Sequence, residues 1–184
     1  MAICIFPGTF NPIHEGHLKM AEFALKKYNF EKIIFIPAYL PPHKEIHSGL
    51  AKHRYKMVEL AIKNNPKFEI SDIEYQSEGK SYSLITVKKI IEQYNIDGRL
   101  NFIIGTDAFA KIDTWYHAEE LKDLVHFIVF PRQGDTIDHI KSWDYELTEM
   151  EMINISSTDI RNGNSNNIIK NIEGYIDKNG LYKV

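Results

Sequence analysis

The stretch Gly8-Thr9-Phe10-Asn11-Pro12-Ile13-His14-Glu15-Gly16-His17 decides the fold, and it directly follows the apolar run Ala2–Phe6. A continuous apolar run of this length is typical of a strand that is buried on both faces of a parallel sheet. From Gly16 onward, apolar residues recur at spacings of three and four, which predicts a helix over His17–Tyr28. A strand, a glycine turn and a helix N-terminus leave backbone N–H groups pointing at one spot, where a nucleotide phosphate can bind.

Strand and helix patterns alternate along the rest of the chain. This alternation predicts an α/β fold, in which a doubly wound, Rossmann-like parallel sheet carries helices on both faces and binds ligands at the carboxyl ends of its strands. We expect residues 1–184 to form a single domain of this kind. The predicted strands are Ala2–Phe6, Lys32–Pro37, Phe68–Ser71, Asn101–Gly105, Val125–Phe130 and a short one at Met152–Ile155. The predicted helices are His17–Tyr28, Leu50–Asn64, Ser83–Tyr94, Trp115–Asp123 and short pieces from Thr158 to Lys178.

The composition is that of a compact enzyme in a reducing compartment. The 184 residues are 43% hydrophobic and 26% charged, which suits one globular domain with a sizeable core. A formal net charge of −3 argues against a general nucleic-acid binder, which would carry a basic excess. Cys4 is the single cysteine and cannot form an internal disulfide, so we expect the cytoplasm. No apolar run approaches the ~20 residues of a membrane span. The sequence leaves the oligomeric state open, a homo-oligomer included.

Two histidines border the predicted phosphate site. His14 and His17 are separated by only two residues, so they do not share a helix face as the two histidines of a zinc-protease helix do. The rest of the sequence shows no cluster with metal-ligand spacing and no recognisable Ser/His/Asp or paired-carboxylate arrangement. We therefore expect no metal held by the protein itself.

Two segments resemble the signatures of the nucleotidylyltransferase superfamily. His14-Glu15-Gly16-His17 is similar to its His-x-Gly-His motif, and Ile155-Ser156-Ser157-Thr158-Asp159-Ile160-Arg161 is similar to its second motif. The resemblance implies a sheet of the nucleotidylyltransferase type. It also implies a reaction in which an acceptor oxygen attacks the α-phosphorus of a nucleoside triphosphate and expels pyrophosphate. The implied ATP-binding residues are Gly8, Thr9, Phe10, His14, His17, Gly105, Asp107, Ile155, Ser156, Ser157, Thr158 and Arg161.

A phosphate acceptor needs no general base in this reaction. Its second pKa lies near ~6, so it is already largely a dianion at neutral pH. What the reaction needs is alignment and positive charge around a highly anionic transition state. We expect His14 and His17 as N–H donors and Lys44 and Arg161 as cations to form the catalytic set. Magnesium, held mainly by the ATP phosphates, is the implied cofactor.

A longer, ordered series of segments resembles the bacterial nicotinate mononucleotide adenylyltransferases. The resemblance implies ATP and nicotinate mononucleotide as substrates, in NAD biosynthesis. By the same analogy, Lys44 and Arg132 face the acceptor phosphate and Trp115 stacks on the pyridine ring. The backbone near Ser83 and Tyr116 receives the carboxylate of that ring. The segments are Pro41-Pro42-His43-Lys44, Ser81-Tyr82-Ser83, Gly105-Thr106-Asp107, Thr114-Trp115-Tyr116, Arg132-Gln133-Gly134 and Tyr175–Tyr182.

Two departures from that family keep an alternative open. Pro7 and Asn11 stand where the family usually has glycine and aspartate, and Pro7 brings the loop closer to the phosphopantetheine adenylyltransferases. These enzymes are the alternative, although we do not expect them to carry the whole series of segments. The Asn11 side chain can still bond neighbouring backbone groups as an Asx turn does, so the loop need not be lost. A non-catalytic nucleotide-binding module is the third hypothesis, which a test for pyrophosphate release distinguishes.

Trp115 and the basic residues of one predicted helix also have an interpretation without a role in the site. Trp115 could be a core aromatic, but its position after Asp113-Thr114 favours a loop and a ligand role. The basic residues of the predicted helix Leu50–Asn64, Arg54 among them, are most simply placed on a solvated face opposite an apolar one.

Overall fold

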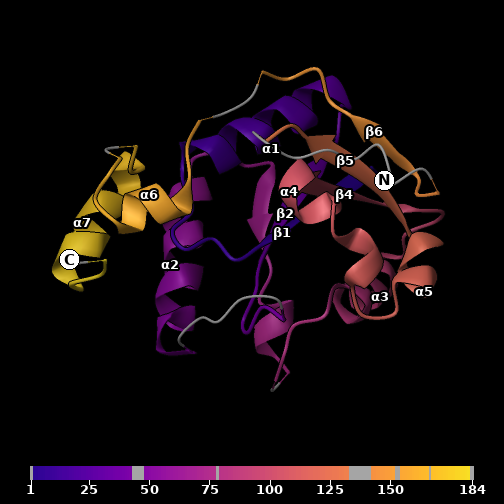
Figure 1. The fold of residues 1–184 in the computed structure, drawn as a ribbon, viewed down its shortest axis with the longest axis horizontal. Coiled ribbons are helices and arrows are strands. Elements are labelled where there is room, and N and C mark those ends of the chain that lie inside the picture. The colour runs from indigo at the N-terminus through magenta and orange to yellow at the C-terminus, as the bar shows by residue number, and fades with distance from the viewer. Residues whose placement is uncertain are drawn as a thin grey trace.

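Six strands form one parallel sheet in the part of the chain that the structure describes, and helices cover both faces of that sheet (Figure 1). The structure is a computed structural model that describes residues 2–42, 48–77, 79–132, 142–151, 154–165 and 167–182. The strand order is β3-β2-β1-β4-β5-β6, and every neighbouring pair is parallel. The strands are β1 (Ile3–Gly8), β2 (Lys32–Pro37), β3 (Phe68–Ile70), β4 (Leu100–Gly105), β5 (Val125–Phe130) and β6 (Tyr145–Leu147).

The helices pack on both faces of the sheet, so the predicted doubly wound α/β architecture is confirmed. They are α1 (Glu15–Lys27), α2 (Ala51–Ile62), α3 (Ser83–Tyr94), α4 (Thr106–Phe109), α5 (Ala118–Lys122), α6 (Ser157–Arg161) and α7 (Lys170–Lys178). The short 3-10 helices are η1 (Ser48–Leu50), η2 (Ile73–Tyr75) and η3 (Ile112–Thr114). None of the helices within the described ranges combines the length and the apolar character that crossing a membrane requires.

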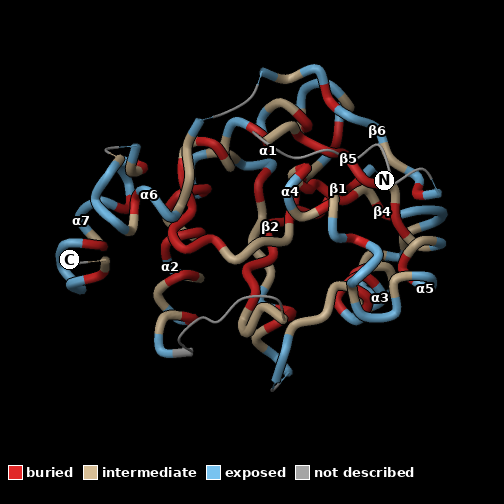
Figure 2. Tube along the Cα trace, viewed as in Figure 1, coloured by how far each residue is buried: buried red, intermediate tan, exposed pale blue. Residues whose placement is uncertain are grey.

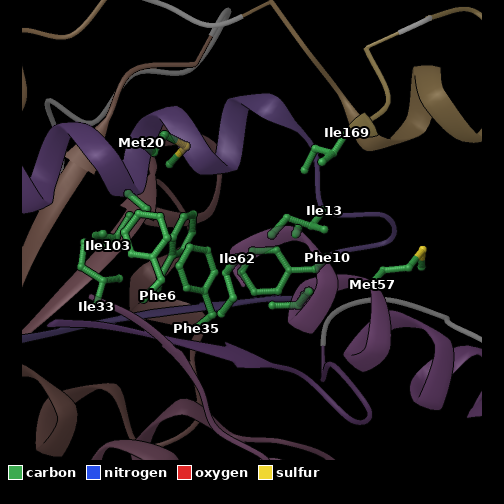
Figure 3. Packing of buried hydrophobic residues seen from close by; sticks show 14 of the residues in the cluster. Phe6, Phe10, Ile13, Met20, Ile33, Phe35, Met57, Ile62, Ile103 and Ile169 are labelled. Atoms are coloured by element: carbon green, nitrogen blue, oxygen red, sulfur yellow. The ribbon is translucent and has the colours of Figure 1, made fainter. Parts of the chain in front are cut away.

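Successive side chains of each strand alternate between two apolar layers. In β1, Cys4 and Phe6 join the layer formed with α1, α2 and α7, while Ile3 and Ile5 join the layer formed with α3 and α5. Figure 3 shows the first layer, where the ring centroids of Phe6 and Phe10 lie 5.4 Å apart. Buried residues accordingly follow the strands and the inner sides of the helices (Figure 2). Because both faces are covered, the strands need apolar residues at successive positions, which explains their continuous apolar runs.

The direction of winding reverses between β1 and β4. From β1, the sheet adds β2 and β3 on one side and β4, β5 and β6 on the other. The pairing of β1 with β4 ends at Ile5, whereas its pairing with β2 continues to Gly8. β1 and β4 therefore separate at their carboxyl ends. Open α/β sheets bind ligands in the crevice at such a point.

Several predicted boundaries differ from the structure by one to three residues, and two of these differences have a clear local reason. β1 continues through Pro7 and Gly8, which we expected to end it, because both residues still pair with β2. The predicted helix Trp115–Asp123 is wrong at its start. α5 begins at Ala118, because His117 adopts a left-handed backbone with φ of 49° that a helix does not continue through.

The sixth strand lies earlier in the chain than predicted. β6 is a short edge strand that pairs with Phe127–Val129 of β5 and is largely exposed. The predicted strand Met152–Ile155 is wrong for its last two residues, which are not in a strand, and its first two lie outside the described residues. A short edge strand has one side open to water, so no continuous apolar run marks it in the sequence.

The prediction that Arg54 lies on a solvated face is also wrong. Its side chain is fully buried and donates hydrogen bonds to backbone carbonyls of the segments that leave β1 and β2. Helical periodicity sorts residues by polarity. It therefore cannot identify a charged side chain that is buried because backbone carbonyls accept its N–H groups.

Candidate active site

Two cavities meet at the carboxyl ends of β1 and β4. The first has a volume of about 710 Å³ and the second of about 600 Å³. Gly8 and Thr9 at the end of β1, and Gly105 and Asp107 at the end of β4, border both of them. Ligands in the two cavities therefore meet at one junction. That arrangement is the one that transfer of a group between two bound molecules requires.

The junction is closely built: a side chain at Gly8 would collide with the buried ring of Phe10, and one at Gly105 would have to displace the exposed carboxylate of Asp107. A Cβ atom at Gly8 would lie 2.9 Å from Cζ of Phe10, and one at Gly105 would lie 2.7 Å from Oδ1 of Asp107. Phe10 is 2% exposed and has a φ of 50°, which folds its ring back toward Gly8 and the core. The loop after β1 is thus held in place by core packing directly beside the cavities.

His14 and His17 line the first cavity, and backbone N–H groups orient their rings. His14 is the N-cap of α1, and its Nδ1 accepts from the N–H of Gly16 at 3.0 Å. Nδ1 of His17 accepts from the N–H of His14, also at 3.0 Å. A neutral imidazole that accepts at Nδ1 carries its proton on Nε2. Both histidines are therefore set to act as Nε2–H donors.

The rings of His14 and His17 pack tightly, and their surroundings decide the protonation of His14. The imidazoles of His14 and His17 stack with centroids 3.7 Å apart, and the ring of Phe10 meets that of His17 edge-on at 5.0 Å. Burial and, to a smaller extent, the positive charge of Arg132 lower the pKa of His14 to about 4. His14 is therefore neutral at pH 7 and offers a donor without a charge of its own.

We expect His14 to titrate near pH 4, well below the ordinary histidine value of 6.5. An NMR titration measures this directly, with the signal assigned by its absence in a His14→Gln variant. The unfolded chain takes up the proton near pH 6.5 and the folded chain only near 4, so His14 makes stability fall as the pH drops through that window. The melting temperature of the wild type should consequently fall further than that of His14→Gln between these pH values. A midpoint at 6.5 or above would contradict this account of the ring's environment.

α6 ties the second motif to the loop after β1. Oγ of Ser157 donates to the carbonyl of Pro12 at 2.9 Å. Nη1 of Arg161 donates to the carbonyl of Asn11 at 2.8 Å, and its Nη2 donates to Oγ1 of Thr158 at 3.1 Å. The two motifs, about 140 residues apart in the chain, thus form one wall of the first cavity. Arg161, predicted as a catalytic cation, also holds this wall together.

Side-chain oxygens stabilise both α6 and the loop after β1 that it contacts. Ser156 is the N-cap of α6, and its Oγ accepts from the N–H of Asp159 at 3.0 Å. Oδ1 of Asn11 accepts from the hydroxyl of Tyr182 at 2.6 Å. The partner of this side chain is therefore a tyrosine far along the chain, and not the neighbouring backbone that an Asx turn would supply. The loop is retained by a long-range contact.

Aromatic side chains and a helix start form the wall of the second cavity. Trp115 is half-buried directly after η3, and its ring centroid lies 6.2 Å from that of Phe102. Tyr82 stacks on Tyr116 with centroids 4.4 Å apart, and Tyr116 is 44% exposed. Ser83 is the first residue of α3, so its N–H belongs to the turn that has no acceptor within the helix. Such a wall suits a flat ring that carries a negative group.

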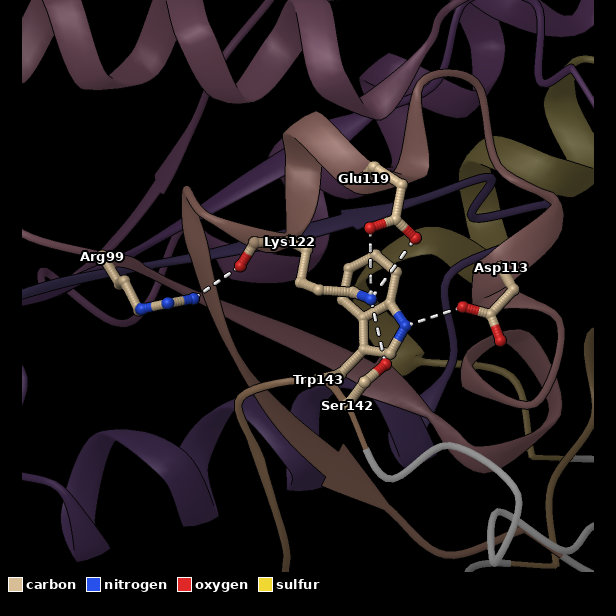
Figure 4. Close-up of polar contacts among 6 residues, drawn as sticks. All are labelled: Arg99, Asp113, Glu119, Lys122, Ser142 and Trp143. Atoms are coloured by element: carbon tan, nitrogen blue, oxygen red, sulfur yellow. Dashed lines mark hydrogen bonds and ion pairs between the residues drawn. The ribbon is translucent and has the colours of Figure 1, made fainter.

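The second tryptophan of the chain anchors η3, the turn that precedes Trp115 (Figure 4). Nε1 of Trp143 donates to Oδ1 of Asp113 in η3 at 2.8 Å. Nζ of Lys122 lies 5.1 Å from the ring centroid of Trp143 and donates to Oγ of Ser142 at 2.9 Å. Trp143 is only 5% exposed, so this anchor is part of the core. It fixes η3, and with it Trp115, against the sheet.

Arg132 follows β5 and lies in the wall of the first cavity, not in that of the second. Its backbone N–H donates to Oγ1 of Thr106 at 2.8 Å, which holds this segment against the start of α4. Its predicted contact with an acceptor phosphate stays a prediction. The junction residues Gly8, Thr9, Gly105 and Asp107 line the same cavity as Arg132. Over the described ranges, no three side chains of His, Cys, Asp or Glu gather closely enough to hold a metal ion.

The structure brings together most of the residues that the sequence nominated. Lys44 lies outside the described residues, and Ile155 lines neither cavity. Sequence reasoning missed Glu74, Ser81 and Lys111 in the second cavity. Of these, only Ser81 stands in a segment that the resemblance had marked. The nominated residues of the first cavity are Gly8, Thr9, Phe10, His14, His17, Gly105, Asp107, Arg132, Ser156, Ser157, Thr158 and Arg161, and those of the second are Ser83, Trp115 and Tyr116.

Comparisons with known proteins find relatives over nearly the whole chain. A family model described as "Cytidylyltransferase-like" matches residues 5–163. A Fusobacterium nucleatum protein named "Probable nicotinate-nucleotide adenylyltransferase" is 40% identical over 183 residues, 97% of this chain and 94% of that protein. A protein of the same name from Caldicellulosiruptor saccharolyticus is 37% identical over the full length of both chains. The solved structure of Plasmodium falciparum nicotinic acid mononucleotide adenylyltransferase complexed with NaAD has the same fold, with a TM-score of 0.80, 24% identity and coverage of 98% of this chain and 96% of that one.

Proposed function

Because the chain belongs to the cytidylyltransferase-like family and, within it, to the nicotinate-nucleotide adenylyltransferases, we propose that it transfers the adenylyl group of ATP to nicotinate mononucleotide. The products are nicotinate adenine dinucleotide (deamido-NAD) and pyrophosphate, in NAD biosynthesis. The observation that carries the proposal is the meeting of two cavities at Gly8, Thr9, Gly105 and Asp107. Each cavity has the side chains that one of the two substrates needs.

ATP occupies the first cavity in this proposal. Its phosphates meet the Nε2–H groups of His14 and His17 and the N-terminus of α6, where backbone N–H groups and the Arg161 side chain gather. Helix starts and fixed N–H donors are the groups that bind phosphates without rearranging. Because His14 is neutral at pH 7, it adds a hydrogen bond to the phosphates but no charge. The positive charge that the phosphates need comes from the cations.

Nicotinate mononucleotide occupies the second cavity. The half-buried ring of Trp115 offers a face on which the pyridine ring stacks. The backbone at Ser83 and Tyr116 receives the ring carboxylate through N–H groups, which match an anion and not an amide NH2. Lys44 and Arg132 are the cations that we assign to the acceptor phosphate.

The chemical step then takes place at the junction. A phosphate oxygen of the acceptor forms a bond to the α-phosphorus while the bond from that phosphorus to the bridging oxygen breaks, and pyrophosphate leaves. The acceptor is largely a dianion at neutral pH, with a second pKa near ~6, so no residue has to remove a proton. The protein contributes alignment of the two phosphates and donors to the charge that shifts onto the α-phosphate.

Magnesium is the metal that we propose for this reaction, held mainly by the phosphate oxygens of ATP. The described wall of the first cavity fits such an ion, because it offers the Asp107 carboxylate as one oxygen ligand, while its N–H donors bind the phosphates that would hold the ion. When bound, the ion neutralises charge on the triphosphate and on the departing pyrophosphate.

A panel of acceptors tests the proposal. With ATP, we expect nicotinate mononucleotide to be preferred over nicotinamide mononucleotide by at least about fivefold in kcat/KM, because the amide leaves a buried mismatch of about 1 kcal/mol or more. Pyrophosphate release and formation of the dinucleotide are measured for each acceptor. Equal turnover of the amide would contradict the assignment of the carboxylate pocket.

The same panel decides between the three hypotheses for the chain. Turnover of phosphopantetheine in place of nicotinate mononucleotide would support the alternative that Pro7 suggested. Binding of ATP without pyrophosphate release from any acceptor would support a non-catalytic nucleotide-binding module. We further propose that residues 1–184 work as one domain in the cytoplasm, where the buried thiol of Cys4 stays reduced.

A further inference from the structure

Arg54 on α2 is a buried cation that joins the segments leaving two neighbouring strands. Its Nη1 donates to the carbonyl of Thr9 at 2.9 Å and to that of Ala38 at 2.6 Å, and its Nη2 donates to the carbonyl of Tyr39 at 2.9 Å. Thr9 follows β1 and borders both cavities, while Ala38 follows β2 and lines the second. One guanidinium therefore spans the gap between the junction and a wall of the second cavity.

Burying this charged side chain costs folding free energy, which argues that its position is not a by-product of packing. The Arg54 side chain is 0% exposed, and its Nε has no hydrogen-bond partner within the described structure. Burying a charged group that is incompletely paired is unfavourable, and an apolar side chain would fill the same space more cheaply. What an apolar residue cannot do is bind the carbonyls of two separate segments at once.

The segment Ala38–Leu40 is held from its other side by Ser81. Oγ of Ser81 accepts from the N–H groups of Tyr39 at 3.3 Å and Leu40 at 3.4 Å. A serine hydroxyl has two acceptor sites, and both are taken by these N–H groups. The backbone N–H of Ser81 donates to the carbonyl of Leu40 at 2.8 Å. The Ser81 side chain also lies close enough to Glu74 to oppose the rise of its pKa that burial causes.

Glu74 extends this contact to α3. It is 8% exposed, and its Oε2 accepts from Oγ1 of Thr86 in the first turns of α3 at 2.7 Å. Ser81, Glu74 and Thr86 thus connect the segment after β2 to the helix whose first residue, Ser83, lines the second cavity. Polar contacts thus follow one another from Thr9 at the junction to the start of α3.

We propose that Arg54 is a positioning residue for adenylyl transfer, which sets the distance between the loop after β1 and the wall of the acceptor cavity. The inference rests on the proposed function. Two substrates held in separate cavities react only if their phosphates meet in line, and small displacements are enough to slow such a step by large factors. Arg54 performs this task through backbone carbonyls and touches neither substrate.

Kinetics of Arg54→Met and Arg54→Lys test the proposal. We expect kcat to fall at least about tenfold in both variants, with smaller changes in the KM values for ATP and nicotinate mononucleotide, because the groups that bind each substrate stay in place. Lysine keeps the positive charge, but its three donors sit on a single nitrogen and cannot reproduce the planar fork whose two nitrogens reach the carbonyls of two segments. Recovery of full kcat in Arg54→Lys would therefore overturn the positioning role in favour of a purely electrostatic one.

Two further variants separate positioning from stability. Val58→Ala, one turn along α2 in the core, should lower the melting temperature and leave kcat unchanged at temperatures where it is folded. Ser81→Ala releases Ala38–Leu40 from the opposite side and should lower kcat even if the arginine variants fail to fold. Wild-type kcat in Arg54→Met, or in Ser81→Ala, would overturn the proposal. A wild type without turnover of any acceptor would instead contradict the proposed function.

Discussion

Replacing His17 with alanine is expected to lower kcat by about 10²–10³-fold, the usual effect of losing one donor to a transition-state oxyanion. His17 accepts the N–H of His14 at Nδ1, so its neutral ring carries a proton on Nε2 in the first cavity. That donor becomes most valuable as negative charge moves onto the α-phosphate. Binding of ATP should change less than kcat, because the remaining donors of the cavity still hold the ground-state phosphates.

Two companion variants decide what His17 contributes. His17→Asn keeps a side-chain acceptor near the position of Nδ1, and so keeps the contact to His14, but lacks the Nε2 donor. We expect its kcat to be as low as that of alanine. His53→Ala is the matched control, since His53 bonds to Tyr175 outside both cavities, and it should leave kcat unchanged. A near-normal kcat in His17→Asn would show that the ring only caps α1.

The sequence predicted the elements whose burial leaves a periodic signal. The strands Lys32–Pro37 and Val125–Phe130 match the structure residue by residue, because both are apolar on two faces. The helix Ser83–Tyr94 matches as well. The helix α4, only four residues long after Gly105, was missed because it is too short to show a helical period. β6 was misplaced because an exposed edge carries no apolar run.

In the candidate site too, local features were predictable and long-range contacts were not. His14 and His17 were predictable, because a local motif fixes their spacing and their caps. The contacts of Asn11 with Tyr182 and of Arg54 with Thr9 join residues 171 and 45 positions apart in the chain. Pairing of this kind is decided by the tertiary fold, and propensity or periodicity in one segment contains no information about it.

Glu74 marks the limit of such reasoning most clearly. In the sequence it is one acidic residue in a polar stretch. In the structure, burial raises its pKa to about 7, opposed by hydrogen bonds from Thr86 and Ser81. Neither its burial nor its place in the wall of the second cavity could be inferred before the segments after β2 and before α3 were known to pack together.

Replacing Trp115 with alanine is expected to raise the KM for nicotinate mononucleotide by roughly 5- to 150-fold, while the KM for ATP hardly changes. The estimate corresponds to about 1–3 kcal/mol for an aromatic face stacked on the pyridine ring. The structure makes the two interpretations of this residue distinguishable. Its ring is half-buried and lines the second cavity, whereas Trp143 is 5% exposed and bonded to Asp113.

The two tryptophans therefore serve as each other's comparison. Trp143→Ala removes a core side chain and should cost about 3–5 kcal/mol of stability, with a large drop in melting temperature. Trp115→Ala should lower the melting temperature much less, and Trp115→Phe, which keeps an aromatic face, should retain most of the affinity for the acceptor. Thermal denaturation recorded beside both KM values decides the question. A collapse of the melting temperature in Trp115→Ala, with parallel losses for both substrates, would reject Trp115 as the surface on which the pyridine ring stacks.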